Sequence, residues 1–197
     1  MSYFLTIDPG LGGTGYAVFK DDPKEWMPHL TGVIQCSEKQ GTLWPQRQTE
    51  IMDKFNDNLI GTFYTSKDGW SIKKAYIELP AMFESAKGMA CATGESGQDS
   101  SLVKLAVLVG RLFESLDGES IHVEFIRVND WKGTLPKKVV SARIQERLRL
   151  PVTAITRFGD HACDAVGMGL YVKGVFKANT VDQSGEKRNV IPRKRNR

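Results

Sequence analysis

The sequence predicts an α/β domain on a mixed five-stranded sheet, with an antiparallel three-strand meander, two parallel strands and helices on both faces. Three apolar runs near the N-terminus, 3–8, 16–19 and 30–34, are separated only by turn-forming segments, as in a meander. Two later runs, 72–79 and 121–128, each follow a segment with helical periodicity, as parallel strands with crossover helices do. Apolar residues make up 41% of the 197 residues, enough for one sizeable core.

The first half of the chain alternates apolar runs with turn signals. The strand 3–8 is followed by the glycine-rich segment 9–15, which we expect to be a tight turn, and the second strand returns at 16–19. Another turn precedes the third strand, 30–34, and a helix follows at 46–59. Its inward face is marked by apolar residues at helical spacing: Ile51, Phe55 and Leu59.

The second half alternates strands with helices. The strand 72–79 stops at Pro80, and residues 80–100, rich in Gly, Ala, Ser and Met, are expected to form a long functional loop. The next helix is capped by Asp99 or Ser100, and we expect its inward side to carry Leu102, Leu105, Ala106, Val109, Leu112 and Phe113. The remaining elements are a strand at 121–128, a helix at 136–148 with Val140, Ile144 and Leu148 inward, and a last helix at 159–176.

Composition indicates one folded domain, residues 1–178, followed by a basic, flexible tail, residues 179–197. Of the 27 basic residues, six lie from Lys187 onward, where there is no acid, so the rest of the chain has 21 basic against 23 acidic residues. Such a tail indicates either an arm for a polyanion or a solubilising end. The chain shows neither a bilayer-spanning apolar run nor a signal peptide. Its three cysteines, Cys36, Cys91 and Cys163, fit a reducing compartment, so we expect a cytoplasmic protein.

Three acidic residues lie where a carboxylate is costly without a counter-charge. Asp8 and Glu78 each close an apolar strand, and Asp164 lies in a stretch suited to a buried helix. His161 precedes Asp164 by three residues and would share its helix face. Because the ends of neighbouring strands form ligand sites, we expect these four side chains to meet there. Asp160 is an alternative to His161 as the fourth ligand, and equally an N-cap.

Three carboxylates and an imidazole favour two Mg²⁺ or Mn²⁺ ions about 4 Å apart, one activating water and the other stabilising the leaving oxygen. Singly, the residues have plainer interpretations: a turn former for Asp8, a solvated strand end for Glu78, and a helix N-terminal pair for His161 and Asp164. The segment 10–15 also permits the phosphate loop of a two-lobed ATPase, but 197 residues leave no room for a second lobe. Together the acidic segments favour a metal-dependent nuclease.

The chain resembles the RuvC family of Holliday-junction resolvases, in the RNase H-like (retroviral-integrase) superfamily, and most of all its phage-encoded members. The motifs that carry the resemblance are Leu5-Thr6-Ile7-Asp8-Pro9-Gly10 with Thr14-Gly15-Tyr16-Ala17-Val18, Ala75-Tyr76-Ile77-Glu78, and His161-Ala162-Cys163-Asp164-Ala165. The resemblance implies an RNase H-like fold and a homodimeric crossover junction endodeoxyribonuclease. Such an enzyme nicks two opposed strands of a four-way DNA junction symmetrically, in a bacterial or phage-infected host cell. It implies catalytic metal ligands at Asp8, Glu78 and Asp164, with His161 as a ligand or proton-transfer group.

The resemblance also suggests residues that contact DNA. Phe83, with Met82 beside it, is the expected wedge between base steps, and its plainer interpretation is packing at a dimer interface. The expected basic contacts are Lys132, Lys137 and Lys138 beside the active site and Arg193, Lys194 and Arg195 in the tail. Gln98 and Lys104 are expected near DNA. Two alternatives remain open: an RNase H-like enzyme that acts on RNA or an RNA/DNA hybrid, and a non-catalytic junction-binding scaffold.

Overall fold

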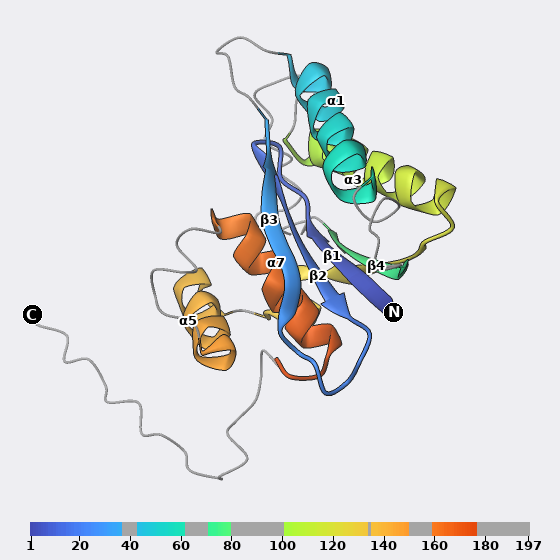
Figure 1. Cartoon of the computed structure of the whole chain (residues 1–197). Helices are drawn as coiled ribbons and strands as arrows, with labels where there is room; N and C mark the ends of the chain where they lie inside the picture. The colour runs from blue at the N-terminus through green and yellow to red at the C-terminus, as the bar shows by residue number, and fades with distance from the viewer. Residues whose placement is uncertain (37–42, 62–70, 80–100, 134, 150–158, 177–197) are drawn as a thin grey trace, which may run out of the picture.

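The structure is a computed structural model that describes residues 1–36, 43–61, 71–79, 101–133, 135–149 and 159–176. The long loop expected after Pro80, the thiol of Cys91 and the basic tail lie outside these residues. The described elements form a three-layer α/β arrangement, with one sheet between two helical layers (Figure 1).

The sheet has five strands in the order β3-β2-β1-β4-β5. Antiparallel pairing joins the first three strands of the chain, whereas β4 runs parallel to β1, and β5 runs parallel to β4. This confirms the predicted mixed sheet of a meander plus two parallel strands. The bounds of the strands are β1 Ser2–Asp8, β2 Gly13–Lys20, β3 Pro28–Gln35, β4 Ser71–Leu79 and β5 His122–Arg127.

The second strand begins three residues earlier than the sequence predicted. Gly13, Thr14 and Gly15 were expected in the turn, but they belong to β2 and pair with β3. The glycines were interpreted as turn formers, yet Gly15 has another physical reason to lack a side chain. A Cβ atom on Gly15 would collide with the backbone of His161, because the last helix comes this close to the strand.

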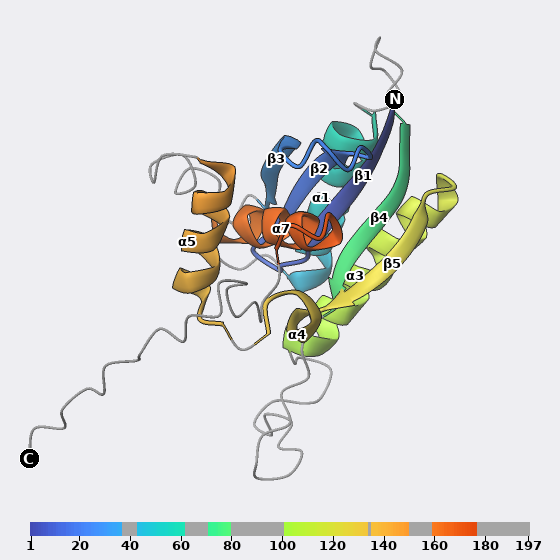
Figure 2. The same ribbon diagram turned by 90° about the horizontal axis from the view of Figure 1, so that it is seen from below.

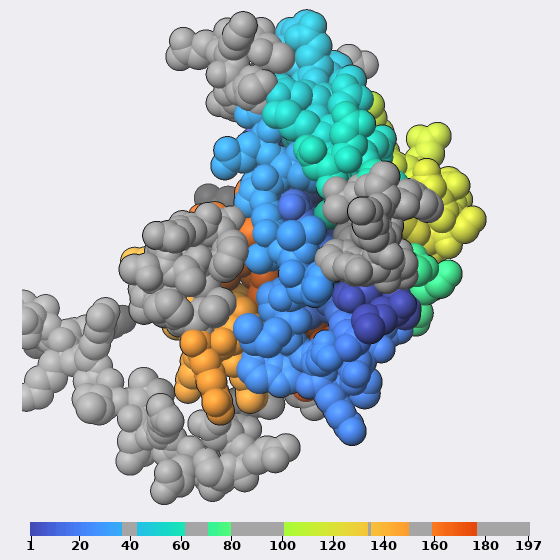
Figure 3. Space-filling model, in the orientation of Figure 1, coloured from blue at the N-terminus to red at the C-terminus, as the bar shows by residue number. Residues whose placement is uncertain are grey.

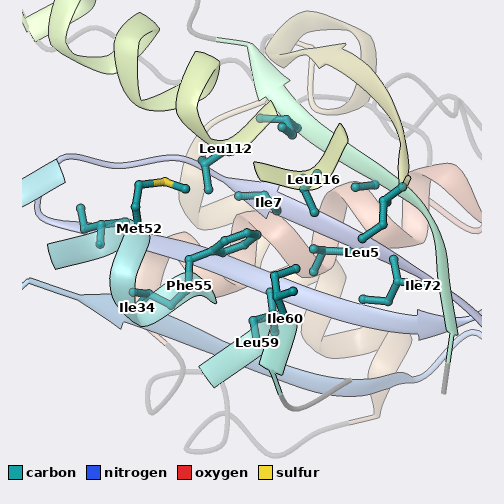
Figure 4. Packing of buried hydrophobic residues seen from close by; sticks show 14 of the residues in the cluster. Leu5, Ile7, Ile34, Met52, Phe55, Leu59, Ile60, Ile72, Leu112 and Leu116 are labelled. Atoms are coloured by element: carbon teal, nitrogen blue, oxygen red, sulfur yellow. The ribbon is translucent and has the colours of Figure 1, made fainter. Parts of the chain in front are cut away.

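One helical layer packs on the sheet through the larger of two cores. It consists of α1 Trp44–Phe55, its π-helical continuation η1 Asn56–Ile60, and α3 Ser101–Gly118. Ile51, Phe55 and Leu59 are buried as the helical spacing predicted, although Leu59 lies in the π-helical turn. Figure 4 shows Phe55 and Leu59 in one core with Leu5 and Ile7 of the central strand, and Ile51 belongs to the same core.

The predicted inward face of α3 is partly wrong. Val109 and Leu112 are buried as expected, together with Leu108 and Leu116. Ala106, Leu102 and Phe113, also expected inward, are exposed. The apolar side of the helix is wide, and the buried residues occupy only the part of it that the sheet covers.

The other helical layer carries α7 Gly159–Val172, which lies across β1, β2 and β3, with α5 Lys137–Leu148 packed beside it (Figure 2). The short α4 Val128–Trp131 directly follows β5. In α5, Val140, Ile144 and Leu148 face inward as predicted. Helix α7 ends at Val172, four residues before the expected end, and the chain then turns at Gly174, which has a positive φ.

The space-filling view shows β3 at the surface, between α1 and α5 (Figure 3). None of the helices among the described residues is both long and apolar enough to cross a membrane.

Candidate active site

Two of the predicted acidic residues close neighbouring parallel strands. Ile7 of β1 pairs with Ile77 of β4, so Asp8 and Glu78, the next residues, reach the same edge of the sheet side by side. Both carboxylates are largely buried, with exposed fractions of 6% for Asp8 and 9% for Glu78. Buried charge of one sign at one place requires a counter-charge or a proton.

The N-terminus of α7 brings His161 to Asp8. The imidazole Nδ1 lies 2.7 Å from Oδ2 of Asp8. Gly10 of the β1–β2 connection and Gly15 of β2 allow this approach, since a Cβ on Gly10 would lie 2.6 Å from His161 Cε1 and one on Gly15 would meet the His161 backbone. Further along the helix, the Thr6 hydroxyl donates a 2.8 Å hydrogen bond to the Ala165 carbonyl and ties α7 to the central strand.

One turn later on α7, Asp164 faces the same cluster and is 7% exposed. Its Oδ2 accepts a 3.2 Å charged hydrogen bond from Lys132 Nζ. Its Oδ1 is buried and has no hydrogen-bond partner. A buried carboxylate oxygen without a donor is rare, because the group loses its hydration and gains nothing in return.

The structure adds one residue that the sequence analysis did not select. Trp131, the last residue of α4, donates a 2.6 Å hydrogen bond from its indole Nε1 to Glu78 Oε2. The available signal was a tryptophan soon after the predicted strand 121–128, since a buried indole N–H requires an acceptor. Three different donors, His161, Lys132 and Trp131, thus each engage one of the three carboxylates.

Burial raises the pKa values of two of the carboxyl groups, Asp8 and Glu78. Burial, reinforced by the charge of Asp8, raises the pKa of Glu78 from 4.5 to about 7, although Lys132 and the Trp131 hydrogen bond act in the opposite direction. Burial also raises the pKa of Asp8, against the hydrogen bond and charge of His161. The hydrogen bond to Asp8 raises the pKa of His161. The cluster is therefore short of positive charge near neutral pH.

A divalent cation fits this deficit. Carboxylate oxygens are the ligands that Mg²⁺ and Mn²⁺ prefer, and the unpartnered Asp164 Oδ1 supplies one such oxygen. Among the described residues, however, no group of three or more His, Cys, Asp or Glu side chains has the arrangement of a metal site. Each of the three carboxylates instead has a protein partner: His161 for Asp8, Lys132 for Asp164 and Trp131 for Glu78.

The basic residues predicted beside the site have different surroundings. Lys132 lies inside the cluster, on Asp164, rather than on an open phosphate-binding surface. Lys137 pairs with Asp160 at 2.9 Å, so Asp160 points to α5 while His161 faces Asp8. Lys138 is exposed on the same helix.

Of the remaining predicted DNA contacts, only Lys104 is among the described residues. Lys104 lies on α3, and its carbonyl accepts a hydrogen bond from Gln48. The other predicted contacts, Met82, Phe83, Gln98, Arg193, Lys194 and Arg195, lie outside the described residues.

Comparison with solved structures identifies the fold. The chain superimposes on Thermus thermophilus RuvC with a TM-score of 0.55 and 14% identity, covering 89% of this chain and 98% of that one. The T. thermophilus RuvC in complex with a Holliday junction substrate matches over the same shares, with a TM-score of 0.56 and 13% identity. The chain has a RuvC-like fold.

At 13% and 14% identity, the likeness to RuvC is one of fold. No protein-family profile matches the chain, and no curated protein matches it in sequence. The RuvC-like fold confirms the RNase H-like class that the motifs predicted, with the mixed sheet at its centre.

Proposed function

We propose that the protein is a metal-dependent endonuclease that resolves four-way DNA junctions. The observation that carries the proposal is the group of buried carboxylates in a RuvC-like fold, with Asp8 and Glu78 at neighbouring strand ends and Asp164 on the helix that packs across the sheet. A chain that needed only a stable core would gain nothing from this cluster, because uncompensated buried charge is destabilising. The solved RuvC complex with a Holliday junction substrate supports the substrate class.

In this proposal Asp8, Glu78 and Asp164 hold two Mg²⁺ or Mn²⁺ ions. Bound ions of this kind lower the pKa of water and neutralise charge on a reacting phosphodiester. His161 keeps Nδ1 on Asp8 while its side chain remains 43% exposed, so its other ring nitrogen can exchange a proton with solvent or substrate. Lys132 provides a positive charge inside the cluster, where it pairs with Asp164 and partly offsets the carboxylates.

We also propose that the protein binds its substrate as a homodimer, with residues 1–178 as the nuclease domain and residues 179–197 as a basic arm. Support for a second copy comes from the α3–β5 face, which we define as Leu102, Val103, Val107, Phe113 and Phe125. All five side chains are exposed, and the rings of Phe113 and Phe125 stack at 5.8 Å between centroids. Exposed apolar side chains on neighbouring elements are one mark of an interaction site.

The test is cleavage of a labelled synthetic four-way junction in Mg²⁺ or Mn²⁺, with linear duplex and an RNA/DNA hybrid as parallel substrates. We expect paired symmetric nicks on the junction alone. Asp8→Asn should fold and bind the junction but lose cleavage, because it removes ligand charge with almost no change in volume.

Cleavage of the hybrid in place of the junction would move the function to RNA processing with the same site. Cleavage by Asp8→Asn at a rate near that of the wild type would refute the assigned role of the cluster. Junction binding without cleavage by the wild type would favour a scaffold.

A further inference from the structure

Trp131 is the least exposed large side chain at the site. It is 0% exposed, and its indole N–H reaches the carboxylate of Glu78 at 2.6 Å. An indole N–H is a donor only, so it holds a carboxylate oxygen in the accepting role and cannot compete as a ligand. The other oxygen, Oε1, is left for a further partner.

The ring is fixed on several sides. A Cβ on Gly167 of α7 would lie 2.6 Å from Trp131 Cζ3, so the helix presents bare backbone to the indole. Phe176 packs on the ring with centroids 6.1 Å apart, and Ile144 of α5 belongs to the same core. A side chain held by α5, α7 and the following turn has one position, and so has its N–H.

The adjacent residue extends this arrangement to a second carboxylate. Lys132 Nζ lies 5.0 Å from the centre of the Trp131 ring and 3.2 Å from Asp164 Oδ2. The cation–π contact places the ammonium over the ring face and limits where the flexible lysine can point. Trp131 therefore influences Glu78 directly and Asp164 through Lys132.

We propose that Trp131 is the positioning residue of the metal site, whose indole N–H fixes Glu78 Oε2 so that Oε1 is presented to the cation. This deepens the proposed nuclease function and rests on it. Partners that orient a ligand in this way typically change metal affinity by about 10–100-fold when they are removed.

The experiment is a titration of the DNA-free, full-length protein with Mn²⁺ at pH 8, in which isothermal titration calorimetry measures the affinity. Trp131→Phe keeps the aromatic volume and removes the N–H. Trp26→Phe is the matched control, since Trp26 is half-buried and packs on the same core. We expect Mn²⁺ to bind Trp131→Phe about 10–100-fold more weakly than the wild type, and Trp26→Phe to bind it as the wild type does.

A second measurement separates positioning from a structural role. If the role is positioning, raising Mn²⁺ to saturation should restore junction cleavage by Trp131→Phe, whereas a folding defect would persist. Should Trp131→Phe fail to fold, 3-benzothienylalanine at position 131 replaces the N–H by sulfur with almost unchanged shape, and the same loss of affinity is expected.

The outcomes distinguish the two proposals. Wild-type protein that binds no Mn²⁺ would overturn the metal site itself, and with it the nuclease. Wild-type protein that binds Mn²⁺ with the same affinity as Trp131→Phe, or as the benzothienyl variant, would overturn only the positioning role.

Discussion

Lys132 Nζ lies 3.2 Å from Asp164 Oδ2, while Oδ1 of the same carboxylate is buried without a hydrogen-bond partner. The lysine charge also acts on Asp8 and Glu78. It favours the ionised form of both carboxyl groups and so opposes burial, which raises their pKa values. One ammonium thus partly neutralises three carboxylates. We interpret Lys132 as the internal counter-charge of the cluster, at the place where a divalent cation would deliver more charge.

This relationship predicts how Lys132→Met changes stability. Without metal at pH 8, the variant should lose about 2 kcal/mol of unfolding free energy, because it leaves a largely buried carboxylate unpaired. With saturating Mn²⁺ the loss should shrink, since the cation takes over the neutralisation. Urea unfolding in EDTA and in Mn²⁺ measures both values, with exposed Lys138→Met as the control. An equal loss in the two buffers would contradict this interpretation.

The raised pKa of Glu78 predicts that the metal-free protein loses stability as the pH rises. A carboxyl group that titrates at about 7 when folded and at 4.5 when unfolded binds more protons in the folded state between these values. Its contribution is present below pH 4.5 and lost as the pH rises through 7, amounting to about 3 kcal/mol. The raised pKa values of Asp8 and His161 change stability in the same direction, because both groups also bind protons more tightly in the folded state.

Unfolding free energies in EDTA from pH 5 to pH 8 check this prediction. Glu78→Gln should flatten the profile, because the amide does not titrate. Added Mn²⁺ should stabilise the wild type more at pH 8 than at pH 5, where protons compete for the ligands. A wild-type profile that rises with pH would show that the carboxylates are compensated in some other way.

Gly15→Ala tests the close approach between β2 and α7. The new methyl group would meet the backbone of His161, which cannot rotate away as a side chain could. We expect a loss of about 3 kcal/mol or more, together with displacement of His161 from Asp8. Gly110→Ala is the control, because its Cβ has open space and the substitution removes a helix-interior glycine. Thermal denaturation of the two variants should therefore shift in opposite directions.

The α3–β5 face predicts the oligomeric state. Phe113→Lys would put two like charges into an interface formed by this face in two copies, and should weaken dimerisation by at least about 100-fold. Sedimentation equilibrium measures the change. Met27→Lys is the control, since Met27 is an exposed apolar residue outside the face. A dimer that persists in Phe113→Lys would place the interface elsewhere.

Truncation after Glu186 removes six basic residues and tests the basic arm. Junction binding should weaken, and the slope of log K against log salt should decrease by up to about 5, as expected for the loss of six phosphate contacts. Binding measured by fluorescence anisotropy between 50 and 200 mM salt gives this slope. An unchanged slope would leave the tail with a solubilising role only.

Much of the fold could be predicted because it depends on local patterns. The turn signals between the first three strands and the helical spacing of Ile51 and Phe55 are carried by neighbouring residues. The inward face of α3 was predicted only in part, because its apolar side is wide and the sheet decides which part of that side is covered. The start of β2 was predicted wrongly because Gly15 was interpreted as a turn residue. Its missing side chain instead makes room for the backbone of α7, which is far away in the sequence.

The candidate site could likewise be predicted only in part from the sequence. The motifs selected Asp8, Glu78, His161 and Asp164, and the structure places Asp8 beside Glu78 at the strand ends with His161 on Asp8. Their role as metal ligands stays a prediction. The donor to Glu78 could not be predicted from the sequence, because the position of Trp131 depends on the register between β4 and β5 and on the short helix α4 that follows β5. The pairing of Lys132 with Asp164 joins residues 32 positions apart, and no local spacing encodes it.

The cluster draws its members from the beginning, the middle and the far end of the domain: β1, β4 and α7. A ribosome that has synthesised β1 and β4 has therefore made two of the carboxylates but no site, because Asp164 and His161 emerge only with α7. Under the proposed function, nascent chains and chains terminated before α7 should thus be unable to cleave DNA. The ability to cleave DNA would be acquired in a single step, when α7 packs across β1, β2 and β3.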